Sequence, residues 1–144
     1  GEERALKKLE EIDNFISQLV KHLKNENPND LYLQKQLNRR IDISEIPKHL
    51  DKNVAYTVNK RSLHICLRNK KGLFETQNNR IYFVIMHELG HIITDEVGHT
   101  PKFWRNFKKI LKTAIKHKLY KYRDYYIDPV EFCNIIINST PLKI

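Results

Sequence analysis

The segment His87-Glu88-Leu89-Gly90-His91 places two imidazoles and a carboxylate within five positions of the chain. Histidines four residues apart lie one turn from each other on the same face of a helix, so both rings can reach a single metal ion. Zinc binds neutral imidazole, and a catalytic zinc site uses three protein ligands and keeps one position open. The segment therefore predicts a Zn²⁺ site with His87 and His91 as two of its ligands.

The carboxylate of Glu88 indicates which reaction the predicted site would catalyse. Zinc lowers the pKa of a water molecule towards 7, and Glu88 is placed to accept the proton of that water as a general base. We therefore expect zinc-dependent hydrolysis of a peptide bond. A tyrosine could help zinc to stabilise the oxyanion, and the sequence does not choose among Tyr120, Tyr122, Tyr125 and Tyr126. The alternative is a pair of hydrogen-bonded core histidines beside an ion-paired Glu88.

The third ligand has to come from chain that has turned back towards the helix. Asp95 follows His87 by eight residues, which is about 12 Å along a straight helix and too far for one tetrahedral ion. Gly98 suits a turn, and His99 follows it directly. We predict His99 as the third ligand, with Glu96 as the alternative and Asp95 as a hydrogen-bonding partner of a ligand.

Apolar periodicity and capping residues predict the elements that hold these groups. Asp30 and Thr100 suit N-caps, and Pro101 suits a first helical position. Helices are expected at residues 3–24, 31–40, 78–94 and 101–120 and in a short segment that begins at Asp128-Pro129. Alternating apolar residues predict strands at 54–58 and 63–67, which would form a hairpin. Further short strands are expected at 73–74 and 135–137. The pattern does not decide residues 41–53.

Length and composition favour one domain of the α+β class. The 144 residues, of which 40% are hydrophobic, suffice for one core. We expect a small antiparallel or mixed sheet packed on a buried active-site helix, with additional helices. Residues 1–50 would form a helical N-terminal segment and residues 51–144 the zinc-site core. The longest apolar run, residues 81–86, is too short to span a bilayer, so no membrane partner is expected.

The positive charge of the chain is concentrated in one segment. The formal net charge is +9, and residues 102–123 contain nine Lys or Arg and no Asp or Glu. Such a stripe is typical of polyanion binding, although a solubilising helix face is the simpler explanation. The candidate nucleic-acid contacts are Lys102, Arg105, Lys109, Lys112 and Lys116.

The cysteines and the other histidines suggest no further site. Cys66 and Cys133 are too few for a disulfide framework, and we expect small buried apolar residues in a reducing, intracellular compartment. The remaining histidines are expected at the surface; they are His22, His49, His64 and His117.

Two blocks of sequence together resemble a known family. The segment 87–91 and the later Gly98-His99-Thr100-Pro101-Lys102-Phe103-Trp104 are similar to the zinc-peptidase core of the WLM and SprT-like families. The similarity is greatest to small predicted metallopeptidases of large DNA viruses of eukaryotes, which also carry a block like Pro129-Val130-Glu131-Phe132-Cys133. The main resemblance covers residues 80–108. Repressor-cleaving peptidases resembling IrrE and ImmA share the first block and fit the second less well.

The resemblance implies a minigluzincin-like α+β fold, zinc ligands at His87, His91 and His99, and a general base at Glu88. Some members of these families degrade proteins crosslinked to DNA. The resemblance therefore implies a protein or peptide substrate, DNA as a partner of the basic segment, and action inside a virus-infected host cell. Seven residues separate His91 from His99, whereas WLM sequences commonly have five and SprT-like sequences more.

A second hypothesis belongs to a different functional class. In it the zinc is structural, and the chain is a non-catalytic module that binds nucleic acid or a protein. We favour the enzyme because a structural zinc site has no use for Glu88.

Overall fold

The computed structural model describes residues 2–47 and 54–142, which form four helices and two small sheets. The fold is of the predicted α+β class. The helices are α1 (Glu2–Glu26), α2 (Leu31–Leu37), α3 (Asn78–Ile92) and α4 (Pro101–Lys116). The strands are β1 (Asp42–Glu45), β2 (Ala55–Val58), β3 (Ser62–Ile65), β4 (Val130–Phe132) and β5 (Ile135–Ile137). The hairpin of β2 and β3 confirms the prediction from alternating residues. Residue 1, residues 48–53 and residues 143–144 lie outside the description.

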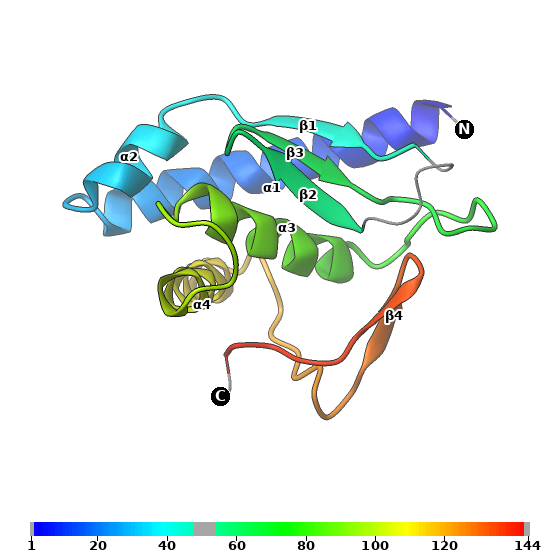
Figure 1. The fold of residues 1–144 in the computed structure, drawn as a ribbon. Coiled ribbons are helices and arrows are strands. Elements are labelled where there is room, and N and C mark those ends of the chain that lie inside the picture. The colour runs from blue at the N-terminus through cyan, green and yellow to red at the C-terminus, as the bar shows by residue number, and fades with distance from the viewer. Residues whose placement is uncertain (1, 48–53, 143–144) are drawn as a thin grey trace.

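The larger sheet has the strand order β1-β3-β2. β1 pairs with β3 in parallel, and β2 pairs with β3 in antiparallel register. Leu63 and Ile65 of β3 are fully buried, whereas Ser62 and His64 on the other face are partly exposed. The helices therefore cover one face of the sheet, with α1 beside β1 and α3 beside β2 (Figure 1). β2 is an edge strand, because β3 is its one partner among the described strands.

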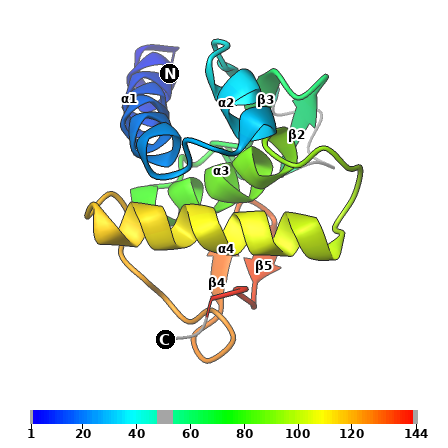
Figure 2. The same ribbon diagram turned by 90° about the vertical axis from the view of Figure 1, so that its left-hand side faces the viewer.

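The two helices that carry the predicted site pack closely on each other. α3 lies between the larger sheet and the β4–β5 hairpin (Figure 1). α4 packs across α3 on a side that neither the sheet nor the hairpin covers (Figure 2). Gly90 permits the close approach: a Cβ built at this position would lie 2.8 Å from Cε1 of Phe103, which is completely buried. A side chain at residue 90 would therefore push α4 away from α3.

Local capping signals account for the starts of α2 and α4. The carboxylate of Asp30 accepts a hydrogen bond from the backbone N–H of Leu33 at 3.1 Å, which caps α2. The hydroxyl of Thr100 accepts one from Phe103 N–H at 3.2 Å, and Pro101 follows as the first residue of α4. Both caps agree with the prediction.

The end of α4 comes earlier than the apolar pattern predicts. Lys118 adopts a left-handed conformation with φ +59°, and the N–H of Leu119 donates back to the carbonyl of Ala114 at 2.8 Å. This is a Schellman motif with lysine at the position that glycine usually takes. The helix therefore ends at Lys116 and not near residue 120.

The predicted final helix is wrong. Residues 130–132 form β4, which pairs with β5 in antiparallel register. The three consecutive isoleucines of β5 favour a strand, and pairing with them outweighs the local Asp-Pro signal for a helix start. Residues 73–74, predicted as a strand, contribute one isolated bridge between Phe74 and Arg68.

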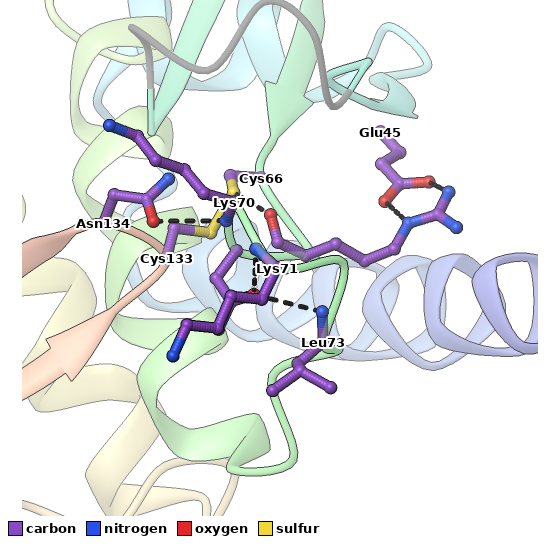
Figure 3. The surroundings of a disulfide bond; sticks show 9 residues. Glu45, Cys66, Lys70, Lys71, Leu73, Cys133 and Asn134 are labelled. Carbon is purple, nitrogen blue, oxygen red and sulfur yellow. Dashed lines mark hydrogen bonds and ion pairs between the residues drawn. A yellow bond between two sulfur atoms is a disulfide. The ribbon is translucent and has the colours of Figure 1, made fainter.

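The prediction for the cysteines is correct for burial but not for bonding. Cys66 and Cys133 are both buried and form a disulfide, with their Cα atoms 6.4 Å apart (Figure 3). The bond ties the β4–β5 hairpin to the chain that follows β3, and Asn134 supports it by accepting a hydrogen bond from the N–H of Lys70 at 3.2 Å. The disulfide removes the reason that the cysteines gave for expecting a reducing compartment.

Among the described residues, no helix is both long and apolar enough to cross a lipid bilayer.

Candidate metal centre

Three histidines from two elements meet at one point. His87 and His91 lie on consecutive turns of α3, and His99 lies in the loop before α4. The three ring centroids are 5.0–5.1 Å apart, so they form a nearly equilateral triangle. One nitrogen from each ring lies within 4.8 Å of the other two. The structure thus brings together the three residues that the sequence predicted as ligands.

The chain reversal that brings His99 back depends on Gly98. Its φ of +88° lies in the left-handed region that glycine tolerates. The two residues weighed beside His99 have other partners. The Glu96 carboxylate accepts a hydrogen bond from the Thr100 hydroxyl at 2.6 Å, and Asp95 forms an ion pair with Lys102 at 2.7 Å. Neither belongs to the histidine cluster.

Lys60, which the sequence did not single out, holds this loop from the tip of the β2–β3 hairpin. Its ammonium group donates hydrogen bonds to the backbone carbonyls of His91 (2.6 Å), Thr94 and Glu96 (3.1 Å). A cation is favourable here because the carbonyl groups at the end of a helix carry partial negative charge. Lys60 reaches them because Asn59 and Lys60 both have φ near +50° in the hairpin turn.

Burial prepares His91 for a metal ion. Desolvation lowers the pKa of His91 to about 4, and the neighbouring His87 and His99 lower it further, while Glu88 opposes the shift. Desolvation also lowers the pKa of His99. At neutral pH both rings are therefore uncharged, which is the form that binds zinc. Three imidazole side chains are a donor set that fits a catalytic zinc ion.

Glu88 lies next to the triangle without belonging to it. The residue is 5% exposed, and its Oε2 lies 2.9 Å from Nδ1 of His87. When Nδ1 carries the ring proton and donates a hydrogen bond to Glu88, the lone pair of Nε2 on the same ring is left for a metal ion. The carboxylate then orients a ligand and still faces the cleft described next.

Two adjoining cavities of about 310 and 590 Å³ share Ala55, His87 and Glu88 in their walls. The larger one runs along the edge strand β2, past Tyr56 and Thr57, to the loop of His99. The smaller one is mainly apolar, and the walls that β5 and α4 add to it are Ile135, Ile136, Ile137, Trp104 and Phe107. Together they form a cleft in which His87 and Glu88 lie where the two cavities meet, and His91 and His99 line the larger one.

The tyrosines considered for the oxyanion do not line this cleft. Tyr120 and Tyr125 are buried, and their hydroxyl groups lie 3.4 Å apart. Both rings pack around Phe83. Tyr56 is the tyrosine in the cleft wall. Its place on an edge strand gave no signal in the sequence, because only the pairing of β2 with β3 places it beside α3.

The basic segment is partly neutralised by acidic residues from distant parts of the chain. Three of its candidate contacts have carboxylate partners: Lys102 with Asp95 (2.7 Å), Lys109 with Asp30 (3.9 Å) and Lys116 with Glu26 (3.4 Å). Arg105, Lys108 and Lys112 are exposed on α4. They have no carboxylate within ion-pair distance in the part of the chain that the structure describes. Their spacing places these three on one face of the helix.

The other histidines differ in part from the surface positions predicted for them. His64 is partly buried, stacks on Tyr56 and lies 2.6 Å from the hydroxyl of Ser44. His22 and His117 are partly buried and stack on each other. His49 lies outside the described residues.

Comparison with known proteins finds relatives in viruses. The chain is 29% identical over 140 residues to "Uncharacterized protein R325" of Acanthamoeba polyphaga mimivirus, an alignment that covers 95% of this chain and 69% of the relative. It is 36% identical over 86 residues to "Uncharacterized protein 136R" of Invertebrate iridescent virus 6, covering 58% of this chain and 48% of the relative. It is 28% identical over 88 residues to "Uncharacterized protein 042R" of Invertebrate iridescent virus 3, an alignment that covers 61% of this chain and 54% of the relative. The alignments with the two iridescent virus proteins therefore span about half of each relative.

No family model matches the chain, and no solved structure gives a significant match. The similarity is thus to viral proteins, and it reaches almost the whole chain in the mimivirus relative.

Proposed function

We propose that the protein is a zinc-dependent metallopeptidase of the HExxH type, similar to WLM and SprT-like peptidases. One observation carries the proposal: His87, His91 and His99 converge beside a buried carboxylate in the wall of an open cleft. Zinc bound by the three imidazoles would lower the pKa of a water molecule and polarise the carbonyl group of the substrate.

The residues of the chain supply the remaining chemistry. The Glu88 carboxylate accepts a proton from the attacking water and passes it to the nitrogen of the leaving amine. The edge of β2 supports a peptide as substrate, because an extended chain can add to an exposed strand through backbone hydrogen bonds. The apolar cavity next to Glu88 would take an apolar side chain of that peptide. Since the relatives are viral proteins, we propose that the protein acts inside infected cells.

Metal removal tests this proposal. The chain should hydrolyse unstructured peptides with apolar residues, lose this activity on chelation, and regain it when Zn²⁺ is added back. His99→Ala should weaken zinc binding to this site and abolish hydrolysis, because two imidazoles on one helix do not complete the ligand set. Glu96→Gln is the matched control in the same loop, and its activity should be close to that of the wild type. Peptide hydrolysis that survives complete chelation, or that His99→Ala leaves intact, would refute the proposal.

The basic face of α4 supports a second candidate function, which is binding of nucleic acid either by a DNA-associated peptidase or by a non-catalytic zinc module. Arg105, Lys108 and Lys112 are exposed, and none of them has an ion-pair partner among the described residues. Arg105 also adjoins Trp104, which lines the same cavity as Glu88. A phosphate backbone along this face would pass close to the cleft.

Salt dependence of binding tests this second function. The double variant Arg105→Gln, Lys112→Gln should bind duplex DNA more weakly, and the slope of log K against log salt should fall by about 2, because each lost phosphate contact removes roughly 0.9. Lys109→Gln is the control, since the ammonium group of Lys109 already faces Asp30. The measurement is fluorescence anisotropy at several salt concentrations. Binding that does not depend on salt, or on these two residues, would exclude the basic face as the contact. Glu88→Gln then distinguishes a DNA-associated peptidase from a non-catalytic zinc module, because a module without catalysis would keep every activity in this variant.

A further inference from the structure

A second cluster of metal-binding side chains lies at the other end of α4. His22 and Glu26 are one turn apart at the end of α1, and His117 caps the C-terminus of α4. Nε2 of His117 lies 2.5 Å from Oε2 of Glu26. One donor atom from each of the three residues lies within 4.8 Å of the other two. We propose that His22, Glu26 and His117 form a second zinc site, which joins α1 to α4.

The donor set suits zinc. Two imidazoles and one carboxylate leave a fourth position of a tetrahedral ion for water. The rings of His22 and His117 stack with centroids 3.5 Å apart and planes 8° from parallel. One ring therefore has to rotate about its side chain before nitrogens of both rings can point at one ion. Both rings are partly buried by the helices that carry them.

The surrounding backbone also favours a cation at this place. α1 ends at Glu26 and α4 ends at Lys116, so the C-terminal ends of both helices meet here. Each end carries the partial negative charge of its last carbonyl groups. Lys116 competes for Glu26 at 3.4 Å, but its side chain is 67% exposed and can turn into solvent when an ion binds.

The cluster is separate from the one on α3. His99 precedes α4 and His117 follows it, and the 16 residues of the helix between them measure about 24 Å at 1.5 Å per residue. One ion cannot serve both clusters. The second ion would link two helices: it would fix α1, which packs on β1 and on α4, against the helix that begins at the first site.

Thermal unfolding with added Zn²⁺ tests the second site. His99→Ala provides the background, because it disables the first cluster. In this variant the Tm should rise with zinc concentration, since an ion bound only to the folded state stabilises it. The added change His117→Gln should abolish the rise, whereas the control His64→Gln, which removes a histidine outside both clusters, should preserve it. A rise that His117→Gln leaves unchanged, or no rise in the His99→Ala variant, would overturn the proposal.

A direct measurement covers the case in which the double variant fails to fold. Crystals of His99→Ala soaked in Zn²⁺ should show an anomalous scattering peak between His22, Glu26 and His117. Absence of a peak there, at a zinc concentration that raises the Tm, would overturn the proposed site.

Discussion

Glu88→Gln is expected to lower kcat/KM for peptide hydrolysis by about 10²–10⁴-fold and to leave zinc affinity nearly unchanged. Glutamine keeps the shape of the side chain and can still accept a hydrogen bond from Nδ1 of His87, which lies 2.9 Å from the carboxylate. It cannot accept a proton from the attacking water. The chemical step should therefore fail while the ligands stay in place. Steady-state kinetics and metal analysis of the same preparation measure both effects.

The value of this variant lies in separating catalysis from structure. An unchanged unfolding temperature and zinc content, together with lost hydrolysis, would assign Glu88 to the reaction. If Glu88→Gln hydrolyses peptides as fast as the wild type, the general-base role is wrong. The chain would then have to activate water in another way or serve as a binding module.

Among the variants proposed here, loss of the disulfide should lower the free energy of unfolding the most. The bond between Cys66 and Cys133 closes a loop of 67 residues (Figure 3), and its removal restores conformational entropy to the unfolded chain. The chain-entropy relation gives about 4 kcal/mol for a loop of this length. We expect the variant Cys66→Ala, Cys133→Ala to lose about this much free energy of unfolding, as measured by urea denaturation.

Reduced wild-type protein provides the control for the disulfide. It should unfold at nearly the same urea concentration as the double alanine variant, because both lack the cross-link. If oxidised and reduced protein have the same free energy of unfolding, the bond does not constrain the chain.

Local signals in the sequence predicted much of the helical structure. The apolar period marked α1 and α3, and Asp30 and Thr100 both cap helices as expected. The histidine cluster was predicted for the same reason: His87 and His91 are one turn apart, and the turn at Gly98 brings the next residue, His99, back towards them. Each of these inferences depends on residues that are close in sequence.

The features that were missed depend on contacts between distant segments. β1 exists because residues 42–45 pair with β3, 20 positions further along the chain. β4 forms because Ile135 and its neighbours pair with it, against a local helix signal. The disulfide joins residues 67 positions apart, and His117 reaches Glu26 across 91 positions. In the second cluster the i, i+4 spacing of His22 and Glu26 was visible, but its third member was not.

The hydrogen bonds of Lys60 have a consequence for how the first cluster would take up its ion. The ammonium group joins the hairpin tip to the carbonyls of His91, Thr94 and Glu96, so the segment that leads to His99 is fixed before any ligand arrives. A preorganised set of donors loses little conformational entropy on binding. Binding of the ion should then leave the backbone almost unchanged, so that the metal-free and metal-bound structures are nearly superimposable.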